Sequence, residues 1–420
     1  VTAELSDRIL ARIDAVVLRI DDPLLRLATG CLLYMHAGID VPNLGAFLVL
    51  VGLAMWACGV ARSKSAAGVL LTTFTCAAAG VIGFFVLGLS IAMQTQNPVF
   101  GFSAAGLYAT TLGPLQIVML GLPVLATAPL AGAVAERSKF WPTVIVAGAL
   151  GAIVLPILIA WCGDNGFLGR MGTDRYSPIG IALLIGATAA LTSAWCIGPR
   201  AGKFNRDGST TFFPGHNLPI AVIGIGIALA GLMLAAGAAG AIVAGTFAMI
   251  AGLLHGQHRY GKPDLVFGMT GLLAGAVLAT ALPSGMPNWA LALLGLIVGA
   301  LGPWAAVQVE LIGRIDEPTT LAKPLGAAVA LAMLIGPLLA SGTAGTRLKL
   351  FGTSLLALLL VTALTAAATF ALWKLMPLLG LTIRASESDE YDGADLASHD
   401  INAYPDFQQT MIKSHHLRQA

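Results

Sequence analysis

The sequence predicts an all-α integral membrane protein with about eleven transmembrane helices, arranged as a five-plus-five inverted repeat plus a C-terminal helix. Three observations predict this class. Of the 420 residues, 57% are hydrophobic and only 10% are charged, with a mean hydropathy of +0.84. Apolar runs of about 20 residues, each long enough to cross a bilayer, recur along the chain. The runs that begin at Ser177 and Lys323 also open alike, SPIGIALLIG and KPLGAAVALA, as the fifth and tenth spans of such a repeat would.

Residues 1–43 precede the first clear span. Ile9, Ile13, Val16 and Ile20 recur at helical spacing among charged residues, which predicts an amphipathic helix at the membrane interface. The apolar stretch that follows is short, and it either dips into the membrane or forms an extra span. We expect a transmembrane domain over 44–380 and a cytoplasmic tail over 381–420.

Each remaining apolar run predicts one membrane-spanning helix. We expect these spans at 44–61, 66–93, 108–135, 141–162, 178–197, 217–237, 239–255, 264–282, 287–312, 321–341 and 350–380. The 50 glycines suit close helix packing, because small residues let neighbouring backbones approach. The five cysteines fall in apolar runs without a CxxC pattern, so we expect packed thiols and no disulfide or metal pairs.

Basic residues in the connections predict the orientation of the chain. One side carries only Arg170, Arg175, Arg347 and Lys349. The other side carries the larger set, which is Arg62, Lys64, Arg137, Lys139, Arg200, Lys203, Arg206, Arg259, Lys262, Arg314 and Lys323. The more basic side, together with the C-terminal tail, is therefore predicted to be cytoplasmic, in a multi-pass protein of the plasma (inner) membrane.

Six stretches resemble, in order and spacing, motifs of the ammonium transporters of the Amt/Mep/Rh type. They are AERSKF (135–140), GPRAGKF (198–204), GHNLP (215–219), GKPDLVFGMTGLLAG (261–275), GRIDEP (313–318) and the tail GLTIRASESDEYDGADLASHDINAYPDF (380–407). The resemblance covers roughly residues 44–407. It implies an eleven-span homotrimer with one pathway per subunit and an outside N-terminus.

The resemblance also implies partners. The tail, whose signature includes Gly393, Asp395, Tyr404 and Pro405, would dock under a neighbouring subunit and could contact PII-type regulators. Membrane lipid is the other expected partner. The sequence has no nucleophile–base pair, phosphate loop or metal-spaced cluster, so we expect no enzyme, no cofactor and no nucleic-acid partner.

This sequence departs from the family at the positions that handle the substrate in the pore. Family members carry two mid-membrane histidines, on the fifth and tenth spans, whose imidazoles share a proton and guide the substrate along an apolar pore. Counting from GPR and DEP places these positions on Leu183 and Leu325, and none of the seven histidines lies in either span. Leucine at both positions would fill and dewet the lumen.

This sequence also departs from the family at the outer selectivity site. There a Trp, a Ser and stacked Phe rings bind the cation. The equivalent positions, with those of a Gln and a Glu on the first span, fall on Val118, Leu122, Cys162 (next to Trp161), Leu234, Ala238, Leu50 and Ala57. Bringing an unpaired cation into such hydrocarbon-like surroundings costs several kcal/mol.

Other single residues allow two interpretations each. Lys323 is either a pore cation that repels ammonium or plugs the lumen, or, as we favour, a lysine that snorkels to the cytoplasmic interface. His216, beside Asn217 and Pro219, is expected to cap and orient the sixth span rather than bind a ligand. The outer loop 162–178 is expected to be a connector. The alternative is a ligand-binding vestibule built from Asp164, Asn165, Arg170, Asp174 and Arg175.

The sequence therefore favours a non-conducting, ammonium-sensing or regulatory member of this family, with a retained scaffold and a degenerate pore. Two alternatives stay open. One is an ammonium or ammonia channel with a different pore lining, and the other is a pore retuned to another small solute.

Overall fold

The computed structural model describes residues 41–94, 97–173, 176–205, 207, 209–236, 240–283, 285–339, 343–401, 403 and 404. The predicted amphipathic helix and the alternative of an extra span at the N-terminus lie outside these residues. So do four of the candidate site residues, which are Asp174, Arg175, Ala238 and Pro405.

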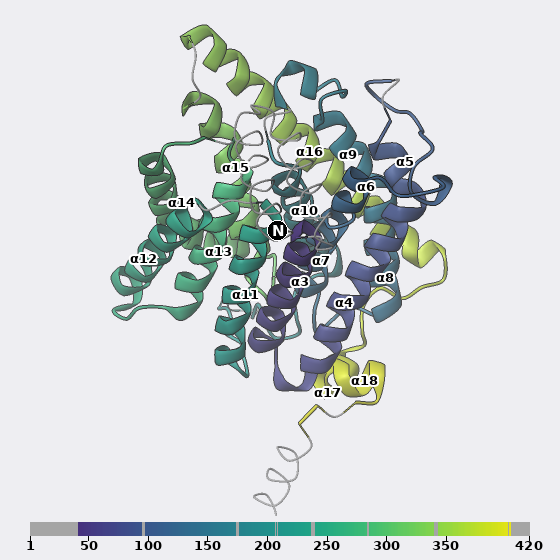
Figure 1. Cartoon of the computed structure of the whole chain (residues 1–420). Coiled ribbons are helices and arrows are strands. Elements are labelled where there is room, and N and C mark those ends of the chain that lie inside the picture. The colour runs from purple at the N-terminus through teal and green to yellow at the C-terminus, as the bar shows by residue number, and fades with distance from the viewer. Residues whose placement is uncertain are drawn as a thin grey trace, which may run out of the picture.

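Helices account for almost all of the regular structure (Figure 1). The first half of the bundle contains α3 (Val41–Val60), η1 (Ser63–Ser65), α4 (Ala66–Gly83), η2 (Phe84–Gly88), α5 (Leu89–Ala92), η3 (Gly106–Tyr108), α6 (Pro114–Met119), α7 (Leu122–Ala133), α8 (Phe140–Ala149), η4 (Leu150–Val154), α9 (Leu155–Cys162), η5 (Gly169–Met171) and α10 (Pro178–Ile197). The second half contains α11 (Leu218–Ala236), α12 (Gly240–Tyr260), α13 (Leu265–Ala281), α14 (Asn288–Gly313) and α15 (Ala322–Leu339). The chain ends with α16 (Ala344–Leu378), α17 (Glu387–Asp392) and α18 (Ala394–His399).

The eleven predicted spans all have a helical counterpart. Within the described residues, 10 helical stretches are long and apolar enough to cross a membrane, and the predicted eighth span is the shorter apolar helix α13. The third span begins later than predicted, at Pro114, because Pro114 favours the first turn of a helix and disfavours helix at the residue before it. The last span begins earlier, at Ala344, where the Thr343 hydroxyl accepts a hydrogen bond from the Thr346 amide.

The packing of the helices reproduces the predicted inverted repeat. The first spans of the two halves, α3 and α11, pack on each other, and so do the fifth spans, α10 and α15. Within the first half α4 packs on α7 and α8, as α12 packs on α13 and α14 in the second. Likewise α7 packs on α10 as α13 packs on α15. One continuous apolar core runs through both halves.

Glycines set the closest contacts between the two halves. A Cβ built on Gly224 of α11 would lie 2.6 Å from the carbonyl oxygen of Gly52 on α3. One built on Gly231 would lie 2.6 Å from the carbonyl oxygen of Gly45. Such backbone contact is what small residues provide between membrane helices.

The tail lies at one end of the bundle, below α4 in Figure 1, and we call this end the tail side. Here α18 packs on η1 and the start of α4 of the same chain. The connections after α3, α7, α10 and α14 meet at the same end, where their charged residues pair. They are four of the five connections that carry the larger set of basic residues. The predicted docking of the tail under a neighbouring subunit stays a prediction.

Candidate functional site

Leu183 and Leu325 lie near the middle of the bundle. Gly326 on α15 faces Ala187, which is midway along α10, and a Cβ built on Gly326 would lie 3.3 Å from the Ala187 Cβ. At 1.5 Å per residue, Leu183 and Leu325 are therefore within about 8 Å of each other along the helix axis. Each is only 1% exposed and belongs to the main apolar core.

The faces around Leu183 are closely packed. A Cβ on Gly186 would lie 2.8 Å from the carbonyl oxygen of Ala126 on α7, and one on Gly180 would lie 2.8 Å from the Ala281 Cβ on α13. Three further positions of the expected pathway, Leu50, Ala57 and Leu122, are also buried in apolar clusters. None of these side chains can donate or accept a hydrogen bond, so these positions offer nothing to replace the water shell of ammonium.

At the end of the bundle opposite to the tail side, Trp161 and Cys162 are the last two residues of α9. The Trp161 indole nitrogen donates to the Val99 carbonyl oxygen at 2.6 Å, and its ring meets Phe167 edge to face. Cys162 is buried, whereas Leu234 on α11 is 39% exposed and lies outside the packed core. Val118 is half-buried on α6, and Asp164 is exposed. Trp161 therefore holds the loop that contains Val99.

The snorkelling interpretation of Lys323 is wrong. Its side chain is only 3% exposed, and the ammonium nitrogen lies 3.0 Å from Glu310 Oε2. A second lysine, Lys203, lies 2.7 Å from Glu310 Oε1. Lys323 also lies on the face of α15 opposite to Leu325, because two residues of helix turn the chain by about 200°. The pore-cation interpretation of Lys323 therefore stays a prediction, with its ammonium turned toward Glu310.

A buried charge cluster joins four connections on the tail side. The Arg200 guanidinium binds both carboxylate oxygens of Asp316, at 2.8 and 2.9 Å, and lies 3.3 Å from Glu136. Glu136 is held in turn by Arg62, at 2.6 Å. Bidentate pairing of this kind fixes the orientation of the guanidinium against the carboxylate and also pairs their charges. Burial alone would raise the pKa of Asp316, but the hydrogen bonds and charges of Arg200, with the charge of Arg137, lower it to about 2.

Arg137 lies beside this cluster, in the connection after α7. It is fully buried and donates to the carbonyl oxygens of Gly198 at 2.6 Å and Asp316 at 2.5 Å. Burial lowers the pKa of the Arg137 guanidinium to about 10, with Asp316 opposing that effect. Arg137 therefore ties the end of α10 to the connection before α15.

That connection, 316–321, is non-helical and buried, which a membrane protein tolerates only where protein groups satisfy the backbone. Glu317 accepts hydrogen bonds from the backbone amides of Leu321 at 2.7 Å and Ala322 at 2.6 Å. The Trp56 indole donates to the Thr319 carbonyl oxygen at 2.7 Å. Burial raises the pKa of Glu317. These contacts start α15 deep in the bundle, close to Leu325.

The tail is fixed by its signature residues. Asp395 accepts from the backbone amides of Ala67 at 3.1 Å and Gly68 at 2.6 Å, so it caps α4. Gly393 has a φ of +106°, and a Cβ there would collide with Lys64. A side chain at position 393 would therefore be both strained and blocked.

The histidine motif connects three segments. His216 lies 3.0 Å from the Ala61 carbonyl oxygen and 2.9 Å from the Tyr404 hydroxyl through its two ring nitrogens. The cap of α11 is Asn217, whose side-chain oxygen accepts from the Ile220 amide at 3.2 Å, and Pro219 is the second residue of that helix. His216 thus joins the end of α3 to the tail, while capping belongs to its neighbour.

Sequence reasoning did not predict that Arg200, Asp316 and Glu317 form buried contacts, because they were assigned to short connections where charges are usually solvated. The signal that could have found them is their recurrence in AER, GPR and DEP, three charged motifs at helix ends on the same predicted side.

Comparison with known proteins agrees with this architecture. A sequence profile described as Ammonium Transporter Family matches residues 43–404. Ammonium transporter Amt2 of Haloferax mediterranei is 28% identical over 403 residues, which cover 86% of this chain and 88% of that protein. Ammonium transporter Amt2 of Archaeoglobus fulgidus is 27% identical over 418 residues, covering 86% of each.

Solved structures share the fold. Sensor Amt Protein superposes with a TM-score of 0.78 at 20% identity, over 85% of this chain and 96% of that one. Mep2 of Candida albicans gives a TM-score of 0.71 at 17% identity, over 83% and 85%. With the profile covering most of the sequence and eleven helices packed as an inverted repeat, the chain belongs to the ammonium transporter family.

Proposed function

We propose that this chain is a non-conducting, ammonium-sensing or regulatory member of its family. The observation that carries the proposal is the pair Leu183 and Leu325, two buried apolar residues at mid-bundle where the family motif has histidines. A cation entering this region would lose its hydration without gaining a partner, which costs several kcal/mol. The same two leucine side chains would leave little room in the lumen for a single row of water molecules.

The intact tail supports a regulatory role. Asp395 caps the start of α4, Gly393 lies against Lys64 of η1, and Tyr404 contacts His216. These tail residues keep their contacts although the pore residues have diverged. The fold likeness to Sensor Amt Protein is consistent with such a role.

The proposal extends to assembly and location. The chain would form a homotrimer, or a mixed trimer with conducting family members, in the plasma membrane. The tail would lie in the cytoplasm, because the basic connections gather on its side. A PII-type regulator would dock on that face.

The test is the ammonium-evoked current of the purified protein in liposomes on a solid-supported membrane. Protein-free liposomes provide the background, and Amt2 of Archaeoglobus fulgidus provides a relative for comparison. We expect no current from the native chain. A saturable current would contradict the proposal and favour a channel with a different pore lining.

A double variant, Leu183→His with Leu325→His, is measured beside the native chain. A gain of current would show that the scaffold is intact and that these two positions block conduction. A swelling assay over small neutral and charged solutes tests the retuned-pore alternative, which requires at least one solute to pass faster than through protein-free liposomes.

A further inference from the structure

The connection that follows α5 carries a group of exposed apolar side chains, and we call residues 97–109 the far loop. It lies beside α5, at the end of the bundle opposite to the tail side (Figure 1). Five large apolar side chains of the far loop are each more than half exposed, and they are Val99, Phe100, Phe102, Leu107 and Tyr108. Residues 97–113 include no charged side chain. An apolar group of this size marks a surface that contacts something other than water.

The far loop folds back along the helix that precedes it. The Ser103 amide donates to the Ser90 carbonyl oxygen at 2.9 Å, and the Ser90 hydroxyl donates to the Ala105 carbonyl oxygen at 2.9 Å. Further along, Gly106 has a φ of +58°, and a Cβ there would collide with the Phe85 carbonyl oxygen. The far loop therefore lies beside residues 85–90 and does not extend beyond the end of the span.

The length of α4 indicates the depth of the far loop in the bilayer. This helix begins at Ala66, where Asp395 of the polar tail caps it, so Ala66 lies at the tail-side boundary of the membrane. At 1.5 Å per residue, Phe85 lies about 28 Å from Ala66, and Ser90 lies about 36 Å from it. The hydrocarbon core of a bilayer is about 30 Å thick. The far loop is therefore level with the boundary between hydrocarbon and headgroups, where non-helical backbone needs partners within the protein.

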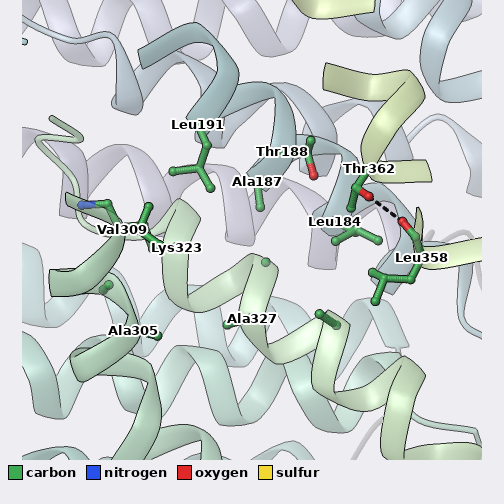
Figure 2. Close-up of a pocket in the computed structure, with 13 residues that line it drawn as sticks. Leu184, Ala187, Thr188, Leu191, Ala305, Val309, Lys323, Ala327, Leu358 and Thr362 are labelled. Atoms are coloured by element: carbon green, nitrogen blue, oxygen red, sulfur yellow. Dashed lines mark hydrogen bonds between the residues drawn. The ribbon is translucent and has the colours of Figure 1, made fainter. Parts of the chain in front are cut away.

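The exposed surface changes from aliphatic to aromatic at this depth. Closer to the tail side, Ile82 and Leu87 are exposed aliphatic residues, and the side chains that line the groove between α10, α14, α15 and α16 include no aromatic ring (Figure 2). The far loop presents Phe100, and Phe102 meets Tyr108 edge to face with ring centroids 5.3 Å apart. Tyrosine is enriched at the headgroup level of membranes, and phenylalanine is typical of interfacial anchors.

The far loop is also fixed to the connection that follows α9. The Trp161 indole nitrogen donates to the Val99 carbonyl oxygen at 2.6 Å, and the Phe167 amide donates to the Pro98 carbonyl oxygen at 3.3 Å. These contacts order the backbone before any partner arrives. The exposed rings therefore lose little further conformational freedom when they contact a membrane.

We propose that the far loop is a membrane-interface anchor. Phe100, Phe102 and Tyr108 lie among the headgroups and ester groups of the leaflet on the far side. The anchor selects no headgroup charge, because the far loop has none of its own. Its depth favours the lipid boundary over water. The aromatic side chains at that depth favour it over a contact between copies of the chain, which would not need to follow the bilayer boundary.

The experiment is depth-dependent quenching of tryptophan fluorescence in the full-length protein reconstituted in vesicles. Phe102→Trp adds an indole to the far loop, and its emission is the difference from the native protein. The quenchers are phosphatidylcholine brominated near the ester end of the acyl chain, phosphatidylcholine brominated near the methyl end, and aqueous iodide. We expect the added emission to be lost mainly with bromine near the ester end and to change little with iodide.

Two control variants calibrate the depth scale. Phe74→Trp replaces an exposed ring of α4 about 12 Å from Ala66, so its added emission should be lost mainly with bromine near the methyl end. Phe212→Trp replaces a ring that is 78% exposed in the connection after α10, and its added emission should be lost with iodide alone.

Tyr108→Trp keeps the test decisive if Phe102→Trp does not fold, because position 108 lies on the other limb of the far loop. Iodide quenching as strong as in Phe212→Trp would place the far loop in water and overturn the proposal. Emission that resists all three quenchers would also overturn it and assign the far loop to a contact between copies. Quenching strongest with bromine near the methyl end would show that the depth is wrong.

Discussion

At the scale of residues, the tail side is held by buried charges that depend on one another. Arg200 and Arg137 both bind the connection at Asp316, through its carboxylate and its carbonyl oxygen. Taking such charges out of water is costly unless each has a partner with good geometry. The cluster is therefore stabilising only while it is complete.

Removal of the Asp316 charge should destabilise the protein strongly. Asp316→Asn leaves the Arg200 guanidinium buried without its bidentate partner, and breaking a buried pair in this way costs about 3–5 kcal/mol. The measurement is the thermal midpoint of the purified protein in detergent. The control is Asp389→Asn, whose partner Lys139 lies 3.2 Å away in a pair more than one-third exposed on both sides. We expect the control to change the midpoint little, and equal losses in the two variants would contradict this account.

The same carboxylate predicts a pH dependence. The pKa of Asp316 is about 2, below the usual value of about 3.9 for a free Asp. Its ionised form thus stabilises the fold, with the full contribution present above about pH 4 and lost as the pH falls toward 2. The difference in thermal midpoint between the native protein and Asp316→Asn should stay constant from about pH 7 to 5 and shrink below about pH 4. A difference that grew on acidification would show that the sign is wrong.

At the scale of elements, close packing of α3 against α11 stabilises the contact between the two halves of the bundle. Gly224 touches the α3 backbone, whereas a Cβ on Gly226 of the same helix would have no neighbour within 4 Å. Gly224→Ala should therefore destabilise the protein by about 1–3 kcal/mol through overpacking. Gly226→Ala, the matched control, should be neutral or stabilising, because alanine is the better helix former. Similar midpoints for the two variants would exclude this contact as a determinant of stability.

The tail should come free when its cap on α4 is removed. Asp395→Ala deletes the acceptor of two backbone amides, whereas Glu387→Ala removes an exposed charge from the neighbouring helix α17. We expect faster proteolysis and faster amide exchange over residues 387–401 in Asp395→Ala only. Unchanged protection in that variant would place the docking energy elsewhere.

At the scale of the whole molecule, the apolar runs in the sequence predicted all eleven spans, because a helix must be apolar along about 20 residues to cross the bilayer. The first residues of the third and eleventh spans were predicted wrongly. Pro114 and Thr343 set where these two helices begin, and hydropathy does not detect such start signals. The buried cluster around Asp316 was missed because it depends on four connections far apart in sequence. The lysine at position 323 was misinterpreted for the same reason, since its partner Glu310 lies on another helix.

The central claim is that this chain has the family scaffold without its conduction. Current detects only net charge movement, so the most direct test is ammonia entry into proteoliposomes that contain a pH-sensitive dye. After rapid mixing with ammonium chloride, we expect the internal pH of vesicles with the native chain to rise at the rate of protein-free vesicles. Vesicles with Leu183→His and Leu325→His, reconstituted at the same density, show whether the scaffold can be opened. A faster rise with the native chain, proportional to protein density, would contradict the account and establish a conducting pathway lined by leucine.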